Sequence, residues 1–156
     1  MKTFKLLFAI LIIAGLNNSR AQGTWTQKAV FGGGFRGGAV GFSIGNKGYL
    51  GTGFSSNGGP KKEFWEYDPT LNSWTQKSDF AGPARFWAVG FSIGNNGYVG
   101  TGYNNYLIYY KDFWEYDPAL NAWIQKTDFP LIERYNAIGF SIGSKGYLGT
   151  GTDSIY

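Results

Sequence analysis

Large apolar residues in this chain alternate with small residues, and not with charged or large polar ones. Val40, Phe42 and Ile44 share one side of the stretch Gly38–Gly45, and its other side carries alanine, glycine and serine. A strand with one face in water would alternate apolar and polar residues, so this pattern predicts strands that are covered on both faces. Small residues opposite large ones allow neighbouring sheets to nest at the density of a protein core.

The same sequence pattern recurs three times along the chain at a fixed interval. The interval is 49 residues in each of three sets, namely Trp25, Trp74 and Trp123, then Arg36, Arg85 and Arg134, then Phe42, Phe91 and Phe140. A period near 50 with several short strands per unit is typical of a propeller blade. Aromatic residues make up 19% of the chain, glycine occurs 25 times and no helical periodicity follows residue 21, so we expect an all-β fold.

Each unit divides into four short antiparallel strands joined by turns rich in glycine and asparagine. The predicted strands are Gly38–Gly45, Lys47–Gly53, Lys62–Asp68 and Ser73–Lys77, then Trp87–Gly94, Asn96–Gly102, Lys111–Asp117 and Ala122–Lys126, and finally Asn136–Gly143 and Lys145–Gly151. Thr24–Lys28 is predicted as the outermost strand of a preceding blade. About two and a half blades are therefore present, fewer than the four that a closed propeller needs. We expect a fragment of a longer protein, with self-assembly of partial rings as the alternative.

Residues 1–21 have the form of a signal peptide. Lys2 and Lys5 precede the apolar run Leu6–Leu16, which is too short to span a bilayer, and small residues lead to an expected cleavage site after Ala21. The remainder, residues 22–156, is expected to be one incomplete propeller domain that is secreted, periplasmic or on the cell surface. A short membrane anchor is the alternative interpretation of this leader. After cleavage we expect no membrane span.

Charge and cysteine content narrow the possible partners. The leader takes three of the 14 basic residues, which leaves 11 against 10 acidic residues and a net charge of +1. The remaining cations are scattered, so the sequence predicts no nucleic-acid partner. The chain has no cysteine, so its stability must come from packing and not from disulfides.

The motifs within each unit resemble a kelch repeat. They are the run from Arg36 to Gly53, the Trp-Glu-Tyr-Asp-Pro turn at 65–69, and Trp74 two residues after Asn72. The chain resembles the kelch propellers of the galactose-oxidase-like superfamily, of the kind found in exported bacterial proteins, although Gly-Thr-Gly replaces the usual double glycine. The resemblance implies that the first strand of each unit lines a central channel and that the fourth is outermost.

Diverging loops mark one face as the candidate ligand face. The turns on one face are nearly identical in all copies, whereas the other face carries the unlike loops Phe54–Lys61 and Tyr103–Tyr110 together with the blade-to-blade loops. Function on a rigid scaffold tends to lie on such variable loops. The candidate ligand-binding residues on this face are Arg36, Arg85, Arg134, Trp87, Tyr135, Tyr103 and Tyr106. Their aromatic faces suit sugar rings or protein patches equally.

The three arginines have two interpretations. In some kelch propellers that bind acidic peptides, an arginine at this repeat position contacts the ligand, so the resemblance implies an arc of guanidinium groups at the channel mouth. The alternative is that each arginine bonds loop carbonyls or a carboxylate such as Glu66 or Glu115. Because the arginine recurs in every copy, the structural interpretation is favoured.

Catalysis is not indicated by the residues present. The copper oxidase of the superfamily needs histidine and cysteine, and the chain has neither; zinc sites are disfavoured on the same count. The acidic residues recur with the repeat and form no single pair suited to glycoside hydrolysis. We therefore expect no cofactor, no metal and a non-catalytic binding or interaction scaffold for protein or carbohydrate. A mutarotase-like sugar enzyme, with its catalytic residues in further blades, is the alternative.

Overall fold

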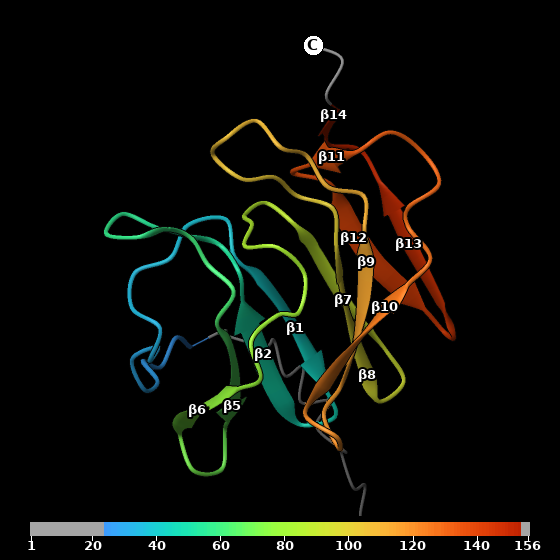
Figure 1. Ribbon diagram of the computed structural model, residues 1–156. Coiled ribbons are helices and arrows are strands. Elements are labelled where there is room, and N and C mark those ends of the chain that lie inside the picture. Colours follow the sequence, from blue (N-terminus) through green and yellow to red (C-terminus); the bar gives the residue numbers. More distant parts are fainter. Residues whose placement is uncertain (1–23, 154–156) are drawn as a thin grey trace, which may run out of the picture.

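The computed structural model describes residues 24–153, and every regular element in this range is a β-strand (Figure 1). The all-β fold predicted from the repeats is therefore confirmed. The predicted leader at residues 1–21 and its cleavage site lie outside the described residues. Within the described range there is no helix of the length and apolar character that a membrane crossing requires.

Two four-stranded antiparallel sheets form the first two repeats, as the 49-residue period predicts. The first sheet has the order β1 (Val40–Ile44), β2 (Lys47–Gly51), β5 (Phe64–Asp68), β6 (Ser73–Lys77). The second has the order β7 (Val89–Ile93), β8 (Asn96–Gly100), β9 (Phe113–Asp117), β10 (Ala122–Lys126). In the third repeat β12 (Ile138–Ile142) pairs with β13 (Lys145–Gly149). The chain is thus an incomplete propeller of like blades.

Two short strand pairs lie at one end of these sheets and were not predicted. One joins β3 (Phe54–Ser55) to β4 (Gly59–Pro60), and the other joins β11 (Arg134–Tyr135) to β14 (Thr152–Asp153). The bridges Gly37 to Phe54 and Phe86 to Tyr103 occupy repeat positions equivalent to Tyr135 and Thr152. Each repeat therefore ties the segment before its first strand to the loop after its second.

The observed strands are shorter than predicted at several ends. The second strand ends at Gly51, not Gly53, because Thr52 turns into the left-handed region with φ 55°. Thr101 and Thr150 do the same in the other repeats, with φ 58° and 64°. The strand predicted at Thr24–Lys28 is wrong: this segment is irregular, since no strand lies beside it among the described residues as β5 lies beside β6.

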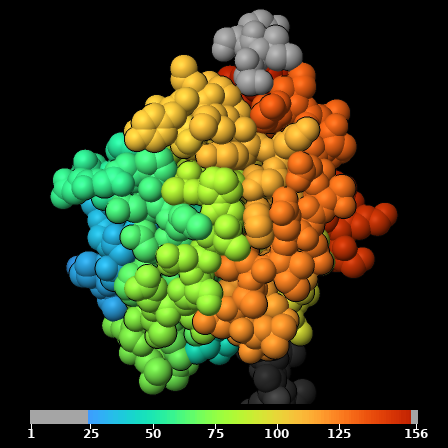
Figure 2. Space-filling model, in the orientation of Figure 1, coloured from blue at the N-terminus to red at the C-terminus, as the bar shows by residue number. Residues whose placement is uncertain are grey.

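Successive sheets pack through their first strands, and large residues fit over glycines. Strand β7 contacts β1 on one side and β12 on the other (Figure 1). A Cβ atom at Gly90 would lie 2.9 Å from Cβ of Val40, and one at Gly97 would lie 2.3 Å from the Phe42 ring. The alternation of large and small residues in the sequence is therefore the contact surface between blades. In the space-filling view, the green, yellow-to-orange and red segments of successive repeats adjoin one another (Figure 2).

Aromatic rings fill the core between the first two sheets. Phe64, Phe80 and Tyr116 are fully buried, and Trp123 packs on all three with ring centroids 4.9 to 5.1 Å apart. Packing of this density replaces the disulfides that the chain lacks, because each buried ring removes a large apolar area from water.

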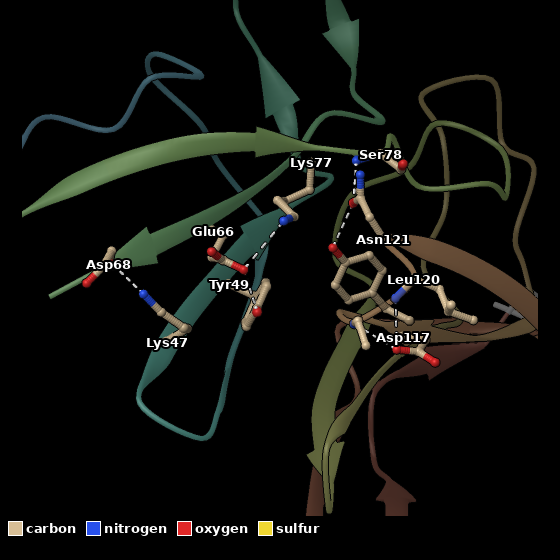
Figure 3. A network of polar contacts seen from close by, with 11 residues as sticks. Lys47, Tyr49, Glu66, Asp68, Lys77, Ser78, Asp117, Leu120 and Asn121 are labelled. Carbon is tan, nitrogen blue, oxygen red and sulfur yellow. Dashed lines mark hydrogen bonds and ion pairs between the residues drawn. The ribbon is translucent and has the colours of Figure 1, made fainter. Parts of the chain in front are cut away.

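The Asp-Pro turns are fixed by side-chain oxygen atoms (Figure 3). Asp117 Oδ1 accepts hydrogen bonds from the amides of Ala119 and Leu120 at 2.8 and 3.3 Å. Asn121, with φ 49°, accepts the Tyr116 hydroxyl at 2.9 Å and the Ser78 amide at 3.0 Å. The first repeat makes the same turn with Asp68 and Asn72, so the recurring Asp-Pro and Asn positions serve the scaffold.

Candidate functional site

Six aromatic side chains gather at the end of the sheets that carries the unlike loops, the upper end in Figure 1. We call them the aromatic cluster: Phe54, Phe86, Trp87, Tyr103, Tyr109 and Tyr135. Trp87 stacks on Tyr103 and Tyr135, with centroids 5.6 and 5.5 Å apart and planes 21° from parallel. Tyr103 also stacks on Tyr109 at 5.5 Å and contacts Phe86 at 4.5 Å. The cluster therefore joins all three repeats.

Trp87 is the exposed member at the centre of the cluster, and its backbone is strained. Its side chain and backbone together are 40% exposed, and its φ is 52°, a conformation that a bulky residue rarely adopts. The equivalent residue of the first repeat is Gly38, with φ 59°. The Trp87 ring lies over it, since a Cβ atom at Gly38 would be 2.6 Å from Trp87 Cδ1. Strained residues of this kind concentrate at functional sites.

Backbone hydrogen bonds hold Trp87 in this conformation. Its amide donates to the Gly38 carbonyl at 2.8 Å, and its carbonyl accepts the Asn136 amide at 2.9 Å. Asn136 has φ 55°, so the same left-handed position occurs in all three repeats. The backbone of Trp87 is thus held by bonds between successive blades, and its indole is positioned by stacking on Tyr103 and Tyr135 before any ligand binds.

The loop that supplies two tyrosines to the cluster is held in shape by Asn104. Asn104 Oδ1 accepts the amides of Tyr106 and Ile108 at 2.9 and 3.1 Å, and its Nδ2 donates to the Tyr110 hydroxyl at 3.1 Å. Burial raises the pKa of Tyr103 above its ordinary value, and nearby Tyr135 adds to this rise. The Tyr103 ring therefore stays neutral at physiological pH and presents a hydroxyl group rather than a charge.

Arg85 is fully buried and bonded to the protein. Its two terminal nitrogens donate to the two carboxylate oxygens of Asp112 at 2.6 and 2.7 Å, and Nη1 also donates to the Thr101 carbonyl at 2.9 Å. Its guanidinium carbon lies 4.2 Å from the centre of the Tyr110 ring. These are the partners expected of a structural arginine, and they leave the group no face toward solvent.

The arginines of the other repeats bind in the same way. Arg36 Nη1 and Arg134 Nη1 each donate at 2.8 Å to a threonine carbonyl, that of Thr52 and that of Thr150. Arg36 also pairs with Glu63 at 3.2 Å. In every repeat the arginine therefore holds the threonine whose left-handed turn ends the second strand.

The carboxylates named for this role from the sequence are the wrong ones. Glu66 and Glu115 lie in the middle of the third strands, where they accept the hydroxyls of Tyr49 and Tyr98, each at 2.7 Å. The arginine partners Glu63 and Asp112 precede those strands, level with the start of the first strand in an antiparallel sheet. Ligand contact by the three arginines stays a prediction, and the described partners are those of the structural interpretation.

Among the remaining predicted site residues, Trp87, Tyr103 and Tyr135 come together and Tyr106 does not join them. Tyr106 is 77% exposed at the tip of its loop. Phe54, Phe86 and Tyr109 were not predicted. Phe86 and Phe54 occupy the repeat positions of Tyr135 and Tyr103, so the 49-residue register applied to those two tyrosines would have found them.

Two cavities lie beside the third repeat and not at the cluster. The first, of about 270 Å³, is lined by Phe91, Phe113, Phe129 and Leu148 among others. The second, of about 490 Å³, adjoins Arg134 and Lys111. At the equivalent places of the second repeat, 49 residues earlier in the sequence, the space is filled by Trp114 of β9, Trp123 of β10 and Asp112. Within residues 24–153, no three histidine, cysteine, aspartate or glutamate side chains lie together as a metal site would require.

Comparison with solved structures supports a propeller fold. The solved structure of YjhT matches with a TM-score of 0.72 and 21% sequence identity, over 80% of this chain and 47% of that one. The chain thus spans less than half the length of that protein. No family model matches the chain, and no curated protein matches its sequence.

Proposed function

We propose that this chain is part of an exported, kelch-type binding protein, without catalysis of its own, that holds a neutral carbohydrate at the aromatic cluster. The observation that carries the proposal is Trp87, a half-exposed indole held on a strained backbone at the junction of all three repeats. A flat aromatic face binds the apolar face of a sugar ring and loses little side-chain entropy, because the ring is already fixed.

The charge of the surroundings favours a neutral ligand over an anionic one. Arg85 lies nearest in sequence to Trp87 and is buried with its charge matched by Asp112, so it offers no donor to a ligand carboxylate. The polar groups that the cluster does present are tyrosine hydroxyls, which donate and accept hydrogen bonds as sugar hydroxyls require. A polyhydroxylated ring therefore fits this site better than an acidic peptide.

The test uses Trp87→Gly. Glycine is the residue of the first repeat at this position and suits the left-handed backbone, so the variant loses the indole without added strain. Binding to an array of neutral oligosaccharides, followed by calorimetry with the best of them, should fall at least about tenfold. The matched control is Leu71→Ala, which removes an exposed apolar side chain from a strand-connecting turn and should bind as the parent does. Absence of binding by the parent chain, or unchanged binding by Trp87→Gly, would contradict the proposal.

A further inference from the structure

The chain contains two Asn-Gly sequences, and the structure places them in opposite settings. They are Asn57-Gly58 and Asn96-Gly97. In such a sequence the glycine amide nitrogen can attack the asparagine side-chain amide, because glycine has no Cβ atom to obstruct the approach. The attack requires an accessible asparagine and a backbone that can rearrange locally. The surroundings of each site therefore decide whether it reacts.

Gly97 is closed off by its own sheet and by the neighbouring blade. It pairs with Ser92 of β7 and with Tyr116 of β9, so it lies in the interior of the sheet. It is buried, and a Cβ atom built on it would lie 2.3 Å from the Phe42 ring. Reaction at Asn96 therefore requires at least local unfolding of this sheet.

Asn57 and Gly58 lie at the tip of the β3–β4 hairpin, the green loop that projects at the left of Figure 1, and both residues are exposed. Each strand of this hairpin contributes only two residues, and so short a pair is marginal on its own. The Gly58 amide donates to the Ser55 carbonyl at 3.2 Å, at the long end of the range for such a bond. Gly58 can therefore change conformation without the opening of a blade.

The ammonium group of Lys61 lies against Gly58. A Cβ atom built on Gly58 would stand 2.7 Å from Lys61 Nζ, whereas at Gly97 the nearest neighbour is the Phe42 ring. Lys61 pairs with Glu63 only at 4.0 Å, and Glu63 also pairs with Arg36 at 3.2 Å. The attacking species is the deprotonated glycine amide, and the attack creates an oxyanion, so a positive charge at Lys61 stabilises both.

From this arrangement we infer that Asn57 is a site of spontaneous deamidation promoted by Lys61, whereas Asn96 is protected by the fold. The Gly58 amide nitrogen bonds to Asn57 Cγ, the Cγ–Nδ2 bond breaks, and ammonia leaves with the proton that the glycine nitrogen gave up. Water then opens the resulting succinimide ring at either carbonyl and leaves aspartate or isoaspartate at position 57. Water is the only co-reactant. This inference is independent of the proposed function.

Both products alter the loop that carries Phe54. Each adds one negative charge, and isoaspartate also lengthens the backbone by one carbon atom. Phe54 pairs with Pro60 in the same hairpin and packs on Phe86, with ring centroids 5.4 Å apart. We therefore expect deamidation to change one edge of the candidate ligand face while the sheets stay intact.

The experiment follows both sites by mass spectrometry of peptides from protein expressed from the full sequence and incubated at increasing pH. In the folded protein the Asn57 peptide should deamidate at least about tenfold faster than the Asn96 peptide, because only the second site needs the sheet to open. The rate at Asn57 should rise with pH, because more of the glycine amide is deprotonated. In urea that unfolds the chain, the two rates should converge. Equal rates in the folded protein, or an Asn57 peptide that stays unmodified there, would overturn the inference.

Variants at Lys61 test its role. Lys61→Met should slow deamidation at Asn57 about two- to fivefold, the effect of one charge a few ångströms away in water, and Lys61→Arg should keep the parent rate. Lys28→Met is the matched control, because Lys28 is exposed and the change in net charge is equal. Continued protection of Asn96 shows that each variant is folded.

A second measure of the same effect needs no variant. Added salt screens the Lys61 charge, so it should slow Asn57 in the parent toward the rate of Lys61→Met. A rate that neither Lys61→Met nor salt lowers, or that Lys28→Met lowers as much as Lys61→Met does, would overturn the part assigned to Lys61.

Discussion

At the scale of single residues, the recurring arginine explains why each second strand ends where it does. A β-branched residue with positive φ is unfavourable, yet Thr52, Thr101 and Thr150 all adopt it. In each repeat the carbonyl of that threonine accepts an arginine Nη1 at 2.8 to 2.9 Å. A charged donor at this distance compensates for the strain of the turn.

Replacing Arg85 by lysine should therefore destabilise the protein. Lysine keeps the charge but loses the paired bonds to Asp112 and the stack on Tyr110, so the free energy of unfolding should fall by about 2 to 4 kcal/mol. Arg134→Lys is the matched control, because its guanidinium makes one described hydrogen bond, and should cost less than about 1 kcal/mol. Chemical denaturation of both variants makes the comparison, and equal losses would contradict a structural role specific to Arg85.

Tyr98 makes stability sensitive to alkaline pH. Burial, together with its hydrogen bond to Glu115, raises the pKa of Tyr98 to about 12 from an ordinary value of 10.0. The unfolded chain releases this proton near pH 10 and the folded chain holds it to about pH 12, so stability is full below pH 10 and falls as the pH rises through this window.

Tyr98→Phe should remove part of that alkaline loss, and melting curves between pH 9 and 12 measure it. The variant should be less stable than the parent at pH 8, where it lacks the hydrogen bond to Glu115, and the difference should shrink toward pH 12. Tyr106→Phe on the exposed loop is the control. A constant difference between Tyr98→Phe and the parent at all pH values would show that the tyrosine proton does not contribute.

At the scale of strands and sheets, the contact between blades depends on glycines that lie under large side chains. Gly97 lies beneath Phe42, where an added Cβ would be 2.3 Å from the ring, whereas Gly48, at the same position of the first repeat, has no atom nearer than 3.7 Å. Gly97→Ala should therefore cost about 1 to 3 kcal/mol of unfolding free energy through overpacking.

Gly48→Ala makes the same chemical change where the added Cβ has room, and it is the natural control. It should change the stability of the monomer by less than about 0.5 kcal/mol. Denaturant midpoints of the two variants, measured at low protein concentration, show whether Gly97→Ala loses more stability than Gly48→Ala. If both lose stability equally, backbone preference and not blade packing sets the requirement for glycine.

The sequence was sufficient for the strands, because their signal is local and repeated. The alternation around Phe42 and the Asp-Pro turns recur with the same spacing, and both predicted four-stranded sheets are confirmed. Strand ends were less accurate, since the left-handed turn at Thr52 depends on an arginine 16 residues away. Thr24–Lys28 was wrongly predicted as a strand because pairing depends on a neighbour and not on local sequence.

The candidate site was predictable only in part. The diverging loops pointed to Trp87, Tyr103 and Tyr135, and the structure stacks these three rings. The recurrence of the arginine favoured a structural role for Arg85, but its partner Asp112 was not visible in the sequence, because it lies 27 residues away. Spacing within a repeat shows which residues are equivalent, but not whether a side chain faces the core or the solvent.

At the scale of the whole molecule, the repeats place the aromatic cluster and the contacts between blades on different parts of the chain. The aromatic cluster lies at the end of the sheets where the loops differ, and the large-over-small contacts run between the sheets. Changes at one of these surfaces should therefore leave the other intact.

The most direct test of the account follows the six tryptophan indole N–H groups by nuclear magnetic resonance during titration with the neutral oligosaccharide that binds best. Only Trp87 has its ring in the aromatic cluster, whereas Trp123 and Trp74 donate to loop carbonyls and Trp114 donates to Asp112. The account predicts that the Trp87 indole signal shifts on binding and that the other five stay in place. A titration that moves the signal of Trp25, Trp65 or Trp114 while Trp87 stays unchanged would contradict it.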